Sequence, residues 1–565
     1  MITIAELPGL KEHLEAYHST SHAHMTECRK YYNKEFKVYK WKNIEGYKPG
    51  TAKNKVDKAR DHLFSIGRRV IVPYFGEAEA KKKLAGKLER AGKGILDTVE
   101  RSRAVNPIAE IMKNVFIYGM FCLKGPLYLE QLYPKKQNMM GLNDEDKKSK
   151  EESWEEERAR AFPFYTRSVP PLNLLIDPTM ENPQYVIEFF TRKALSIKTM
   201  WPKWNQKGYD DFDDVDWWEY WDKDRYCYWV GKGEDSTCVT GGFVDNKMGY
   251  LPYHIGLSGL GEESPDGAPE YRIVSLLYQA ISGIQAEADI KTAAKAFMLL
   301  NVYGKPRVKL QTPNIKMAKA LGEISIIPEE AGYEDPDPPR LNPDLFKIIG
   351  MIDQDIDEST VARVLEGEVM PAFESGYDRA IATGQARLKL QAPHDAIENV
   401  LSNYLTCYGP LIKNVVGDRI TIFGYHPEGT VNETIGPGDF KSNPIFVVKL
   451  DGETPEEQDR KFRMGLELWA AKALPWETIC KDFWGYDPTQ QRKLMQIGAA
   501  MDDPRIHEAI TNLAIQTHGL NRYIRDVQES VKKPGNLPPD SVQKLQRLGS
   551  IGQPTELGSV PEGEL

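Results

Sequence analysis

Apolar residues recur at helical spacing over a long stretch in the middle of the chain. From Tyr271 to Met298 they return every three or four positions, which predicts a helix of about eight turns. A second helical pattern begins after Pro343, and its apolar face is formed by Leu345, Ile348, Ile349, Ile352 and Ile356. An irregular segment with several prolines separates the two. We therefore expect a helical hairpin with a small knob at its tip.

Helical and strand patterns are mixed over the rest of the chain. Two-residue alternation on both sides of Asp222-Lys223-Asp224 predicts a β-hairpin over Trp217–Val230. Helical spacing is found over residues 1–35, 56–72, 77–103, 106–121, 377–416, 455–473 and 476–484, and strand patterns over 420–423 and 445–450. Pro393 lies inside one of these helices and should kink it. Together the patterns predict an α+β protein.

Composition narrows the class of protein. A chain of 565 residues is too long for one core, so we expect several domains. No run approaches the ~18 apolar residues of a membrane helix, and the N-terminus lacks a secretory pattern, so we expect no membrane association. Six cysteines without a CxxC pair indicate reduced thiols in a cytosolic setting. A net charge of −9 argues against a protein that grips DNA through its phosphates.

Two short motifs suggest ligand sites, and neither fits well. His18, His22 and His24 have spacing that could hold a metal, but no fourth ligand is visible, so we favour a solvated helix end. The stretch Gly86–Gly94 approaches a phosphate loop, but it has five residues between its first two glycines and Gly94 where a hydroxyl is needed. We therefore predict no catalytic residues, no metal and no cofactor.

Aromatic side chains are dense in the predicted β-hairpin. They are Trp217, Trp218, Tyr220, Trp221, Tyr226, Tyr228 and Trp229. Stacked aromatics could bind a sugar or single-stranded bases. Because aromatic residues are also strong strand formers and cross-strand partners, we favour an ordinary sheet face.

Several short patterns occur in an order that resembles the portal proteins of tailed bacteriophages. A Pro-Pro-x-Asn-x-x-x-Asp-Pro segment at Pro170–Pro178 precedes the aromatic hairpin with Glu219-Tyr220-Trp221-Asp222. A Gly-x-x-Pro-Tyr segment at Gly249–Tyr253 then leads into the long helix. The resemblance covers most of residues 55–520, and it rests on the order of the elements more than on any single pattern.

The resemblance implies a multidomain portal architecture that assembles into a ring. Its parts would be an N-terminal wing of helices and aromatic-rich sheet (1–267), a descending stem helix (268–300), a small α/β clip (301–342), an ascending stem helix (343–362), a tunnel loop (363–376), a long wing helix with returning strands (377–450), a helical crown (451–530) and a disordered tail (531–565).

The resemblance also implies a function and partners. Such a ring of twelve copies occupies one capsid vertex and forms the channel through which double-stranded DNA is packaged and later ejected. Its expected partners are the terminase large subunit, the major capsid protein and head-tail adaptor or tail proteins. The expected location is the virion, with assembly in the host cytoplasm.

Acidic residues on the two stem helices would line the channel. The predicted lining residues are Asp353, Asp355, Asp357, Glu358 and Glu287. Carboxylates repeated around an axis would repel and centre a duplex that carries about one negative charge per ~1.7 Å. The alternatives are a solvated face for the ascending helix, and for Glu287 and Asp289 a pairing with Lys291 and Lys295 at helical spacing. We leave the second choice open.

The segment after the ascending helix would be a mobile loop that projects into the channel. It contains Arg363, Glu366, Gly367, Glu368, Pro371 and Gly376, and its glycines and proline interrupt a helix. Arg379, Arg387 and Lys389 come after this loop. They could contact DNA phosphates, or pair with acids of a neighbouring subunit, which we favour in a ring.

Two other function classes are alternatives to the portal. A nuclease or glycan hydrolase would use the acidic residues and the Trp-rich sheet, but Asp353, Asp355 and Asp357 on one helix do not converge on a metal. A capsid or tail adaptor of another kind is the third class. Assembly size separates a ring from an enzyme that works as a monomer.

Overall fold

The computed structural model describes residues 2–40, 44–65, 67–74, 79–134, 143–180, 182–204, 208–231, 237–302, 307–309, 332–334, 344–360, 386–426, 429–451 and 455–483, together with Arg492 and Met495. Contacts divide the chain into two units, Met1–Gly452 and Glu453–Leu565. The first unit holds the sheets and the predicted helical hairpin.

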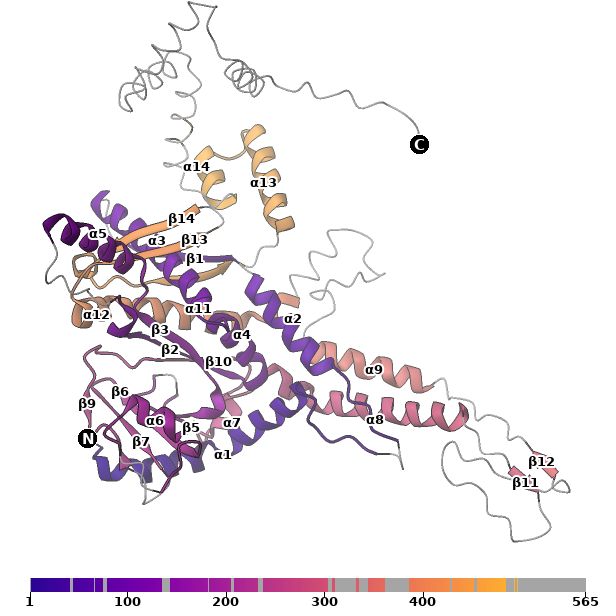
Figure 1. The fold of residues 1–565 in the computed structure, drawn as a ribbon. Coiled ribbons are helices and arrows are strands. Elements are labelled where there is room, and N and C mark those ends of the chain that lie inside the picture. The colour runs from indigo at the N-terminus through magenta and orange to yellow at the C-terminus, as the bar shows by residue number, and fades with distance from the viewer. Residues whose placement is uncertain are drawn as a thin grey trace, which may run out of the picture. The chain divides into compact units, whose positions relative to one another are not determined.

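A six-stranded antiparallel sheet packs against the first long helix (Figure 1). Its strands are β4 (Leu174–Ile176), β5 (Tyr185–Lys193), β6 (Asp214–Asp222), β7 (Arg225–Val230) and β8 (Thr237–Cys238), with β9 (Val244–Asp245) also paired to β7. α1 (Leu7–Tyr32) places Leu7 and Leu14 on this sheet, and α6 (Ala194–Met200) follows β5. The predicted aromatic hairpin is confirmed as β6 and β7.

A three-stranded sheet lies at the centre of the first unit. β2 (Met120–Tyr128) pairs with β10 (Tyr253–Leu257) on one side and β3 (Phe164–Val169) on the other. α4 (Pro107–Tyr118) leads into β2, and the Asn106 side chain caps it by accepting hydrogen bonds from the backbone of Ile108 and Ala109. α4 is apolar on most of its surface, which fits a helix buried on several sides.

α11 (Gln391–Thr406) and α12 (Tyr408–Leu411) complete the central core. The hydroxyl of Tyr404 lies 2.7 Å from that of Thr166 on β3, which ties α11 to the sheet. The predicted kink at Pro393 takes another form. Residues 386–388 are helical, Lys389 and Leu390 form a turn, and α11 begins at Gln391, so Pro393 lies in a first turn where its missing N–H breaks no hydrogen bond.

A third group of elements joins distant parts of the sequence. α3 (Glu79–Arg101) packs on the antiparallel pair β13 (Ile420–His426) and β14 (Gly429–Ile435). α5 (Asp144–Arg160) is an exposed helix built from a charged run. α2 (Thr51–Ser65) ends before β1 (Gly67–Ile71), which pairs with β15 (Val447–Asp451). The prediction of one helix over 56–72 is therefore wrong after Ser65, because a strand far along the chain pairs with that segment.

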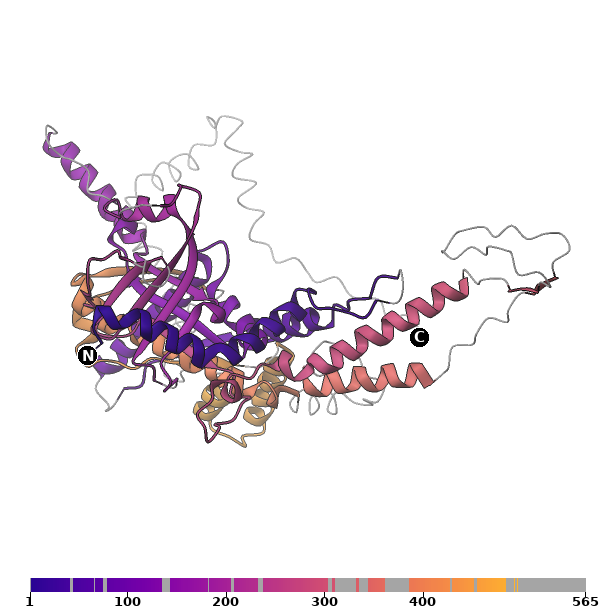
Figure 2. The same ribbon diagram turned by 90° about the horizontal axis from the view of Figure 1, so that it is seen from below.

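Two antiparallel helices form the predicted hairpin. The single helix expected over 268–300 is divided into α7 (Pro269–Arg272) and α8 (Leu276–Val302), with the Ser275 hydroxyl accepting a hydrogen bond from the backbone of Tyr278. α9 (Asp344–Ser359) lies alongside α8 (Figure 2). Of the expected clip, 301–342, the structure describes the end of α8 and the paired strands β11 (Arg307–Lys309) and β12 (Gly332–Glu334).

The second unit is described over residues 455–483. It contains α13 (Pro455–Ala470), α14 (Trp476–Thr478) and a π-helical turn over Ile479–Phe483. The rings of Trp469 and Trp476 lie 5.4 Å apart and join the two helices. The expected tail, 531–565, lies outside the described residues. Among the helices that the structure describes, none combines the length and apolar character needed to cross a bilayer.

Candidate functional site: the helical hairpin

α8 and α9 approach each other closely near the base of the hairpin. A Cβ atom placed on Gly283 of α8 would lie 3.0 Å from Cγ1 of Ile356, which is buried on α9. The buried residues of α8 lie mainly in its first half: Leu276, Leu277, Ala280, Ile284 and Ala288. On α9 the predicted apolar face meets α8 through Ile356, whereas Ile348 on the same predicted face is 46% exposed.

Three of the five predicted lining carboxylates lie at the surface of α9. Asp355 and Glu358 are exposed, and Asp353 is half-buried. Glu358 accepts a hydrogen bond from Gln354 at 2.8 Å, one turn earlier. α9 therefore presents an acidic surface to solvent in the single subunit.

The other two lining candidates are held inside the subunit. Asp357 forms an ion pair with Lys55 of α2 at 2.6 Å, and the two side chains are only 16% and 8% exposed. Glu287 is 3% exposed and accepts from Lys291 at 2.5 Å and from Thr51 at 3.0 Å. The pairing of Glu287 with Lys291, one of the two alternatives left open, is therefore confirmed. A place for Glu287 on a channel wall is wrong, because α2 covers this side of α8.

Polar side chains link α2 to both helices of the hairpin, through Thr51 and Glu287 on α8 and through Lys55 and Asp357 on α9. Burial opposes the charge on Lys291, but its hydrogen bond to Glu287 and the charges of Glu287 and Asp353 raise its pKa above the ordinary value. Asp289 accepts from Gln285 and from the backbone of Tyr39, and Lys295 donates to the backbone of Glu45. For Asp289 and Lys295, which belong to the alternative left open, the contacts are with Gln285 and with the segment after α1.

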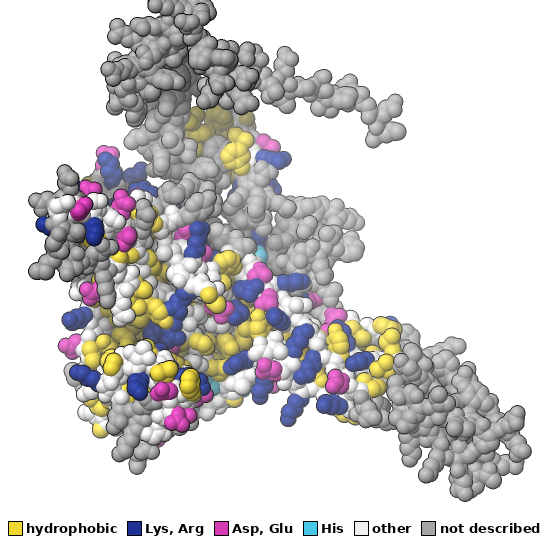
Figure 3. Space-filling model, in the orientation of Figure 1, with side chains coloured by type: hydrophobic (Ala, Val, Ile, Leu, Met, Phe, Trp, Pro, Cys, Tyr) yellow, Lys and Arg dark blue, Asp and Glu magenta, His cyan; other side chains and the backbone are white. Residues whose placement is uncertain are grey.

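Large apolar side chains are exposed toward the far end of the hairpin. Met298 of α8 is 60% exposed, and on α9 Phe346 and Met351 are each 66% and Ile348 is 46% exposed. Figure 3 shows hydrophobic side chains gathered over this end of the hairpin. Exposed apolar patches on a folded chain commonly mark a surface that another molecule covers.

The remaining predicted site residues belong to the tunnel loop and the segment after it. The expected tunnel loop, 363–376, and Arg379 lie outside the described residues. Lys389 donates to the backbone carbonyl of Glu358 at 2.7 Å, so it lies beside the end of α9. Arg387 is half-buried in the short helical segment just before this turn. These contacts are within one subunit, and the expected contacts with phosphates or with a neighbouring subunit stay predictions.

The structure contains a buried charge cluster that the sequence did not reveal. Lys124 of β2 donates to Glu188 of β5 at 2.8 Å and to Glu219 of β6 at 2.7 Å, and the three residues are at most 6% exposed. Arg167 of β3 pairs with Glu188, and Tyr253 donates to it. The cluster joins the three-stranded sheet to the six-stranded one. Only the inward alternation of β5 and β6 could have signalled that two glutamates enter a core.

Every charge of this cluster has a partner of opposite sign. Burial opposes the ionisation of Glu219, but the charge and hydrogen bond of Lys124 outweigh it and hold the pKa of that carboxyl below its ordinary value. The indole N–H groups of Trp217 and Trp221 donate to the same carboxylate at 3.1 and 3.2 Å. A buried network in which each charge is paired fixes the relative position of the two sheets.

The Trp-rich sheet is part of the core, as the favoured alternative had it. Trp217, Trp218 and Trp221 are at most 4% exposed, and Trp221 stacks on Tyr226 at 4.3 Å between ring centres. Its acidic residues Glu188 and Glu219 already hold Lys124. These residues give the hydrolase alternative no support.

The N-terminal histidines hold α1 to the sheet. Nε2 of His18 lies 2.8 Å from the carbonyl of Ile176, and that of His22 lies 3.2 Å from the carbonyl of Leu174. His24 stacks on Tyr278. Burial lowers the pKa of His22 to about 4, and that of His18 in the same direction. The expectation of a solvated helix end is wrong for His18 and His22, because β4 packs against this face of α1.

Comparison with known proteins returns a weak structural likeness. No family model matches the chain, and no curated protein matches it. A chain of the neck of an empty gene transfer agent (GTA) particle computed with C6 symmetry is 10% identical, with a TM-score of 0.39, over 78% of this chain and 91% of that one. A chain of the neck of the native particle computed with C12 symmetry is 10% identical, with a TM-score of 0.38, over 76% and 89%. A chain of the native virion is also 10% identical, with a TM-score of 0.37, over 78% and 90%. With TM-scores below 0.5, this likeness decides neither the fold nor the function of the chain.

Proposed function

We propose that the chain is the portal protein of a tailed bacteriophage. Twelve copies form a ring at one capsid vertex, and the α8–α9 hairpins surround the channel through which double-stranded DNA is packaged and ejected. The ring is also the platform on which the terminase large subunit, the major capsid protein and head-tail adaptor or tail proteins dock. The order of short sequence patterns from Pro170 to the long helix supports this assignment.

The observation that carries the proposal is the exposed apolar surface of the hairpin. Phe346, Ile348 and Met351 expose apolar area on α9 that a solitary chain would leave in water. Burying a side chain of this size stabilises an interface by about 1.5–3 kcal/mol. In a ring, the same patch recurs on every copy and meets a different surface of the next one, as closed rotational symmetry requires.

The acidic residues of α9 give the hairpin its expected relation to DNA. Asp353, Asp355 and Glu358 remain at the surface after the subunit has folded, whereas Asp357 is paired with Lys55. Repeated around an axis, the three open carboxylates repel the phosphates of a duplex from every side, so DNA slides and does not adhere. The net charge of −9 agrees with a protein that lets DNA pass.

Electron microscopy and native mass measurement of the purified full-length chain test the assembly. The expected result is a ring with a central hole, with α9 facing it. A stable monomer at micromolar concentration contradicts the proposal, and so does a ring that places Asp355 and Glu358 on its outer surface.

DNA packaging tests the acidic surface separately. The double variant Asp355→Lys and Glu358→Lys is expected to form rings and to package DNA poorly, because lysines hold phosphates that carboxylates repel. Asp357 is left unchanged, since it pairs with Lys55 within the subunit. The matched control Glu152→Lys and Glu155→Lys, on the exposed surface of α5, should package normally. Normal packaging by the α9 variant would contradict the role of these carboxylates.

A further inference from the structure

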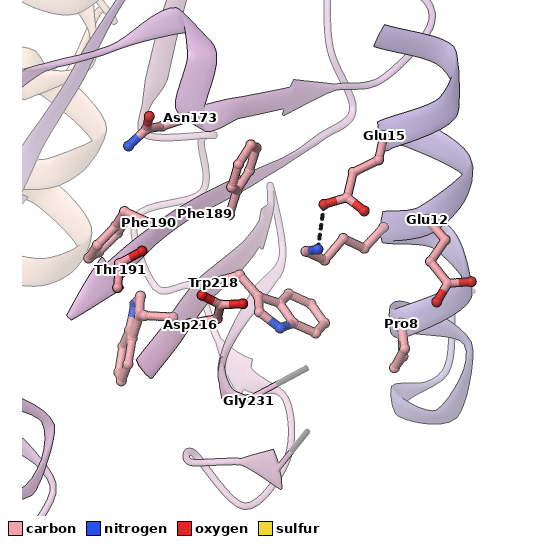
Figure 4. A pocket seen from close by; sticks show the side chains of 12 residues that line it. Pro8, Glu12, Glu15, Asn173, Phe189, Phe190, Thr191, Asp216, Trp218 and Gly231 are labelled. Carbon is pink, nitrogen blue, oxygen red and sulfur yellow. Dashed lines mark hydrogen bonds and ion pairs between the residues drawn. The ribbon is translucent and has the colours of Figure 1, made fainter. Parts of the chain in front are cut away.

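Two pockets of the first unit share the residue Asn173, which lines both of them. In the smaller pocket, of about 620 Å³, Lys11 and Glu15 of α1 form an ion pair with 2.5 Å between Nζ and Oε1, drawn in Figure 4 as a dashed line. The larger pocket, of about 870 Å³, is lined by the end of α1, by α4 and by β3, and we call it the α1–α4 pocket. None of its described lining residues belongs to α8 or α9, so its ligand does not depend on the proposed DNA channel.

Basic side chains outnumber acidic ones in the α1–α4 pocket. The described charged residues of its lining are Arg29, Arg103, Lys113, Arg167 and Glu110. Two of the cations are neutralised within the chain, since Lys113 lies 2.6 Å from Glu110 and Arg167 pairs with Glu188 of the buried cluster. The two other arginines give the pocket its surplus of positive charge.

Neither Arg29 nor Arg103 has a carboxylate partner among the residues that the structure describes. Arg29 is exposed in the last turn of α1. Arg103 lies over the ring of Tyr165, with 4.0 Å between Cζ and the ring centre. A cation–π contact of this kind positions the guanidinium but leaves its positive charge uncompensated.

α4 adds a hydrogen-bond donor to the same lining. Burial raises the pKa of the Tyr118 phenol, and the positive charge of Arg29 acts against this rise. The hydroxyl is therefore protonated at neutral pH and lies within the field of Arg29. One turn earlier, Asn114 is 5% exposed and donates to the Ser168 hydroxyl at 3.2 Å, which holds α4 to β3. The wall that carries Tyr118 is thus in place before a ligand arrives.

We propose that the α1–α4 pocket binds an acidic segment of a partner protein. One carboxylate would accept hydrogen bonds from Arg29 and Tyr118, and such bonds are about twice as strong when a partner is charged. Arg103 would attract a second acidic residue of the same segment.

The apolar part of the lining favours a peptide over a nucleic acid. Val105 is 59% exposed, Pro170 is exposed and Leu172 is half-buried, so apolar area is accessible beside the arginines. A peptide in which acidic and apolar residues alternate would cover this area as well as the charges. A phosphate backbone would meet the charges alone.

Fluorescence anisotropy of the full chain with two matched peptides tests the proposal. The probes are labelled acetyl-Glu-Leu-Glu-Phe-Glu-amide and its counterpart with glutamine for glutamate, which has the same shape without the charge. The glutamate peptide is expected to bind about tenfold more tightly, because charged hydrogen bonds are stronger than neutral ones. Its affinity should fall as the salt concentration rises, since salt screens accessible charges.

Variants then assign the binding to named residues. Arg29→Gln and Arg103→Gln should each weaken binding of the glutamate peptide several-fold, and Tyr118→Phe should weaken it less. Arg29 is exposed near the end of a helix, so its replacement leaves the fold intact. The matched control Arg69→Gln, at an exposed position of β1 outside this lining, should change nothing.

Five outcomes would overturn the proposal. Three concern the peptides: no binding at millimolar glutamate peptide, equal binding of the glutamine peptide, and unchanged affinity in both arginine variants. Tighter binding of an oligothymidine that displaces the peptide would assign the pocket to a nucleic acid. A change in the oligomeric state of Arg29→Gln, measured by mass photometry, would assign it to a second copy of the chain.

Discussion

Charged side chains are buried and paired in the cluster around Lys124, whereas several on the surface of the α8–α9 hairpin are exposed. In the cluster, Lys124, Glu188 and Glu219 are at most 6% exposed and each has a partner of opposite sign. On α9, Asp355 and Glu358 are exposed beside large apolar side chains. The first region is complete within one chain. The second leaves charged and apolar side chains at the surface of the chain, where the ring and the DNA proposed above would meet them.

Removing the central lysine of the cluster should have the largest effect on stability. Lys124→Met leaves two glutamates buried with less positive charge beside them, and breaking such a pair costs about 3–5 kcal/mol. Chemical denaturation of the first unit measures this loss. The control Lys193→Met removes an exposed pair with Asp214, whose side chains are 53% and 64% exposed, and should cost less than about 1 kcal/mol. Equal losses would show that the cluster is no more important than a surface pair.

Acid should weaken the same core through His254. Burial lowers the pKa of His254 to about 4 from its ordinary 6.5, and its Nε2–H donates to the carbonyl of Gly125 at 2.7 Å. The folded state keeps the ring neutral, whereas the unfolded chain takes up a proton below about pH 6.5. The stabilisation is present above pH 6.5 and falls by about 3 kcal/mol as the pH drops to about 4. Denaturation of wild type and His254→Asn across this range should differ in slope, and parallel curves would contradict the assignment.

Truncation of the exposed apolar surface should affect assembly and leave the subunit intact. Phe346→Ser removes a 66% exposed phenyl group from α9. The free energy of unfolding of the subunit should change little, whereas each contact between neighbouring subunits should lose about 2 kcal/mol. Mass photometry over a dilution series should show dissociation at a more than tenfold higher concentration. Phe212→Ser, at a ring that is 78% exposed and away from the hairpin, is the control. Identical dissociation of both variants would remove the basis for an interface at this end of α9.

Substitution of two nearby aspartates of α9 should distinguish a paired carboxylate from an exposed one on the same helix. Asp357→Asn breaks a pair with Lys55 whose side chains are 16% and 8% exposed, and should cost about 1–2 kcal/mol of unfolding free energy. Asp355→Asn, on an exposed carboxylate two residues earlier, should cost less than about 0.5 kcal/mol. Thermal unfolding measures both. A larger loss at Asp355 would contradict the placement of the α9 acidic surface.

The sequence predicted the regular elements well where the periodicity was long or strongly alternating. The helices now seen as α1, α3, α4, α9 and α13, and the β6–β7 hairpin, follow directly from apolar spacing and the Asp222–Asp224 turn. β14 and the strand β1 were missed, because each depends on a partner: β1 on β15, almost four hundred residues later, and β14 on β13.

For the candidate site, the sequence predicted which helix carries the acidic residues but not which of them remain open. Asp353, Asp355, Asp357 and Glu358 are indistinguishable by charge and spacing alone. Only the packing of α2 against the hairpin places Lys55 on Asp357 and buries Glu287 beside Thr51. His18 is a second example. Its local pattern predicts a solvated helix end, but the packing of β4 against α1 makes it a core residue.

The sequence by itself determined the helical hairpin, the aromatic sheet and the excess of negative charge, because these depend on side-chain spacing and composition within short windows. The tertiary structure alone decided which charges are paired, which are buried and which face solvent. The physical reason is that the energy of a charge depends on what desolvates it and what lies within a few ångströms, and both are supplied by segments distant in the chain.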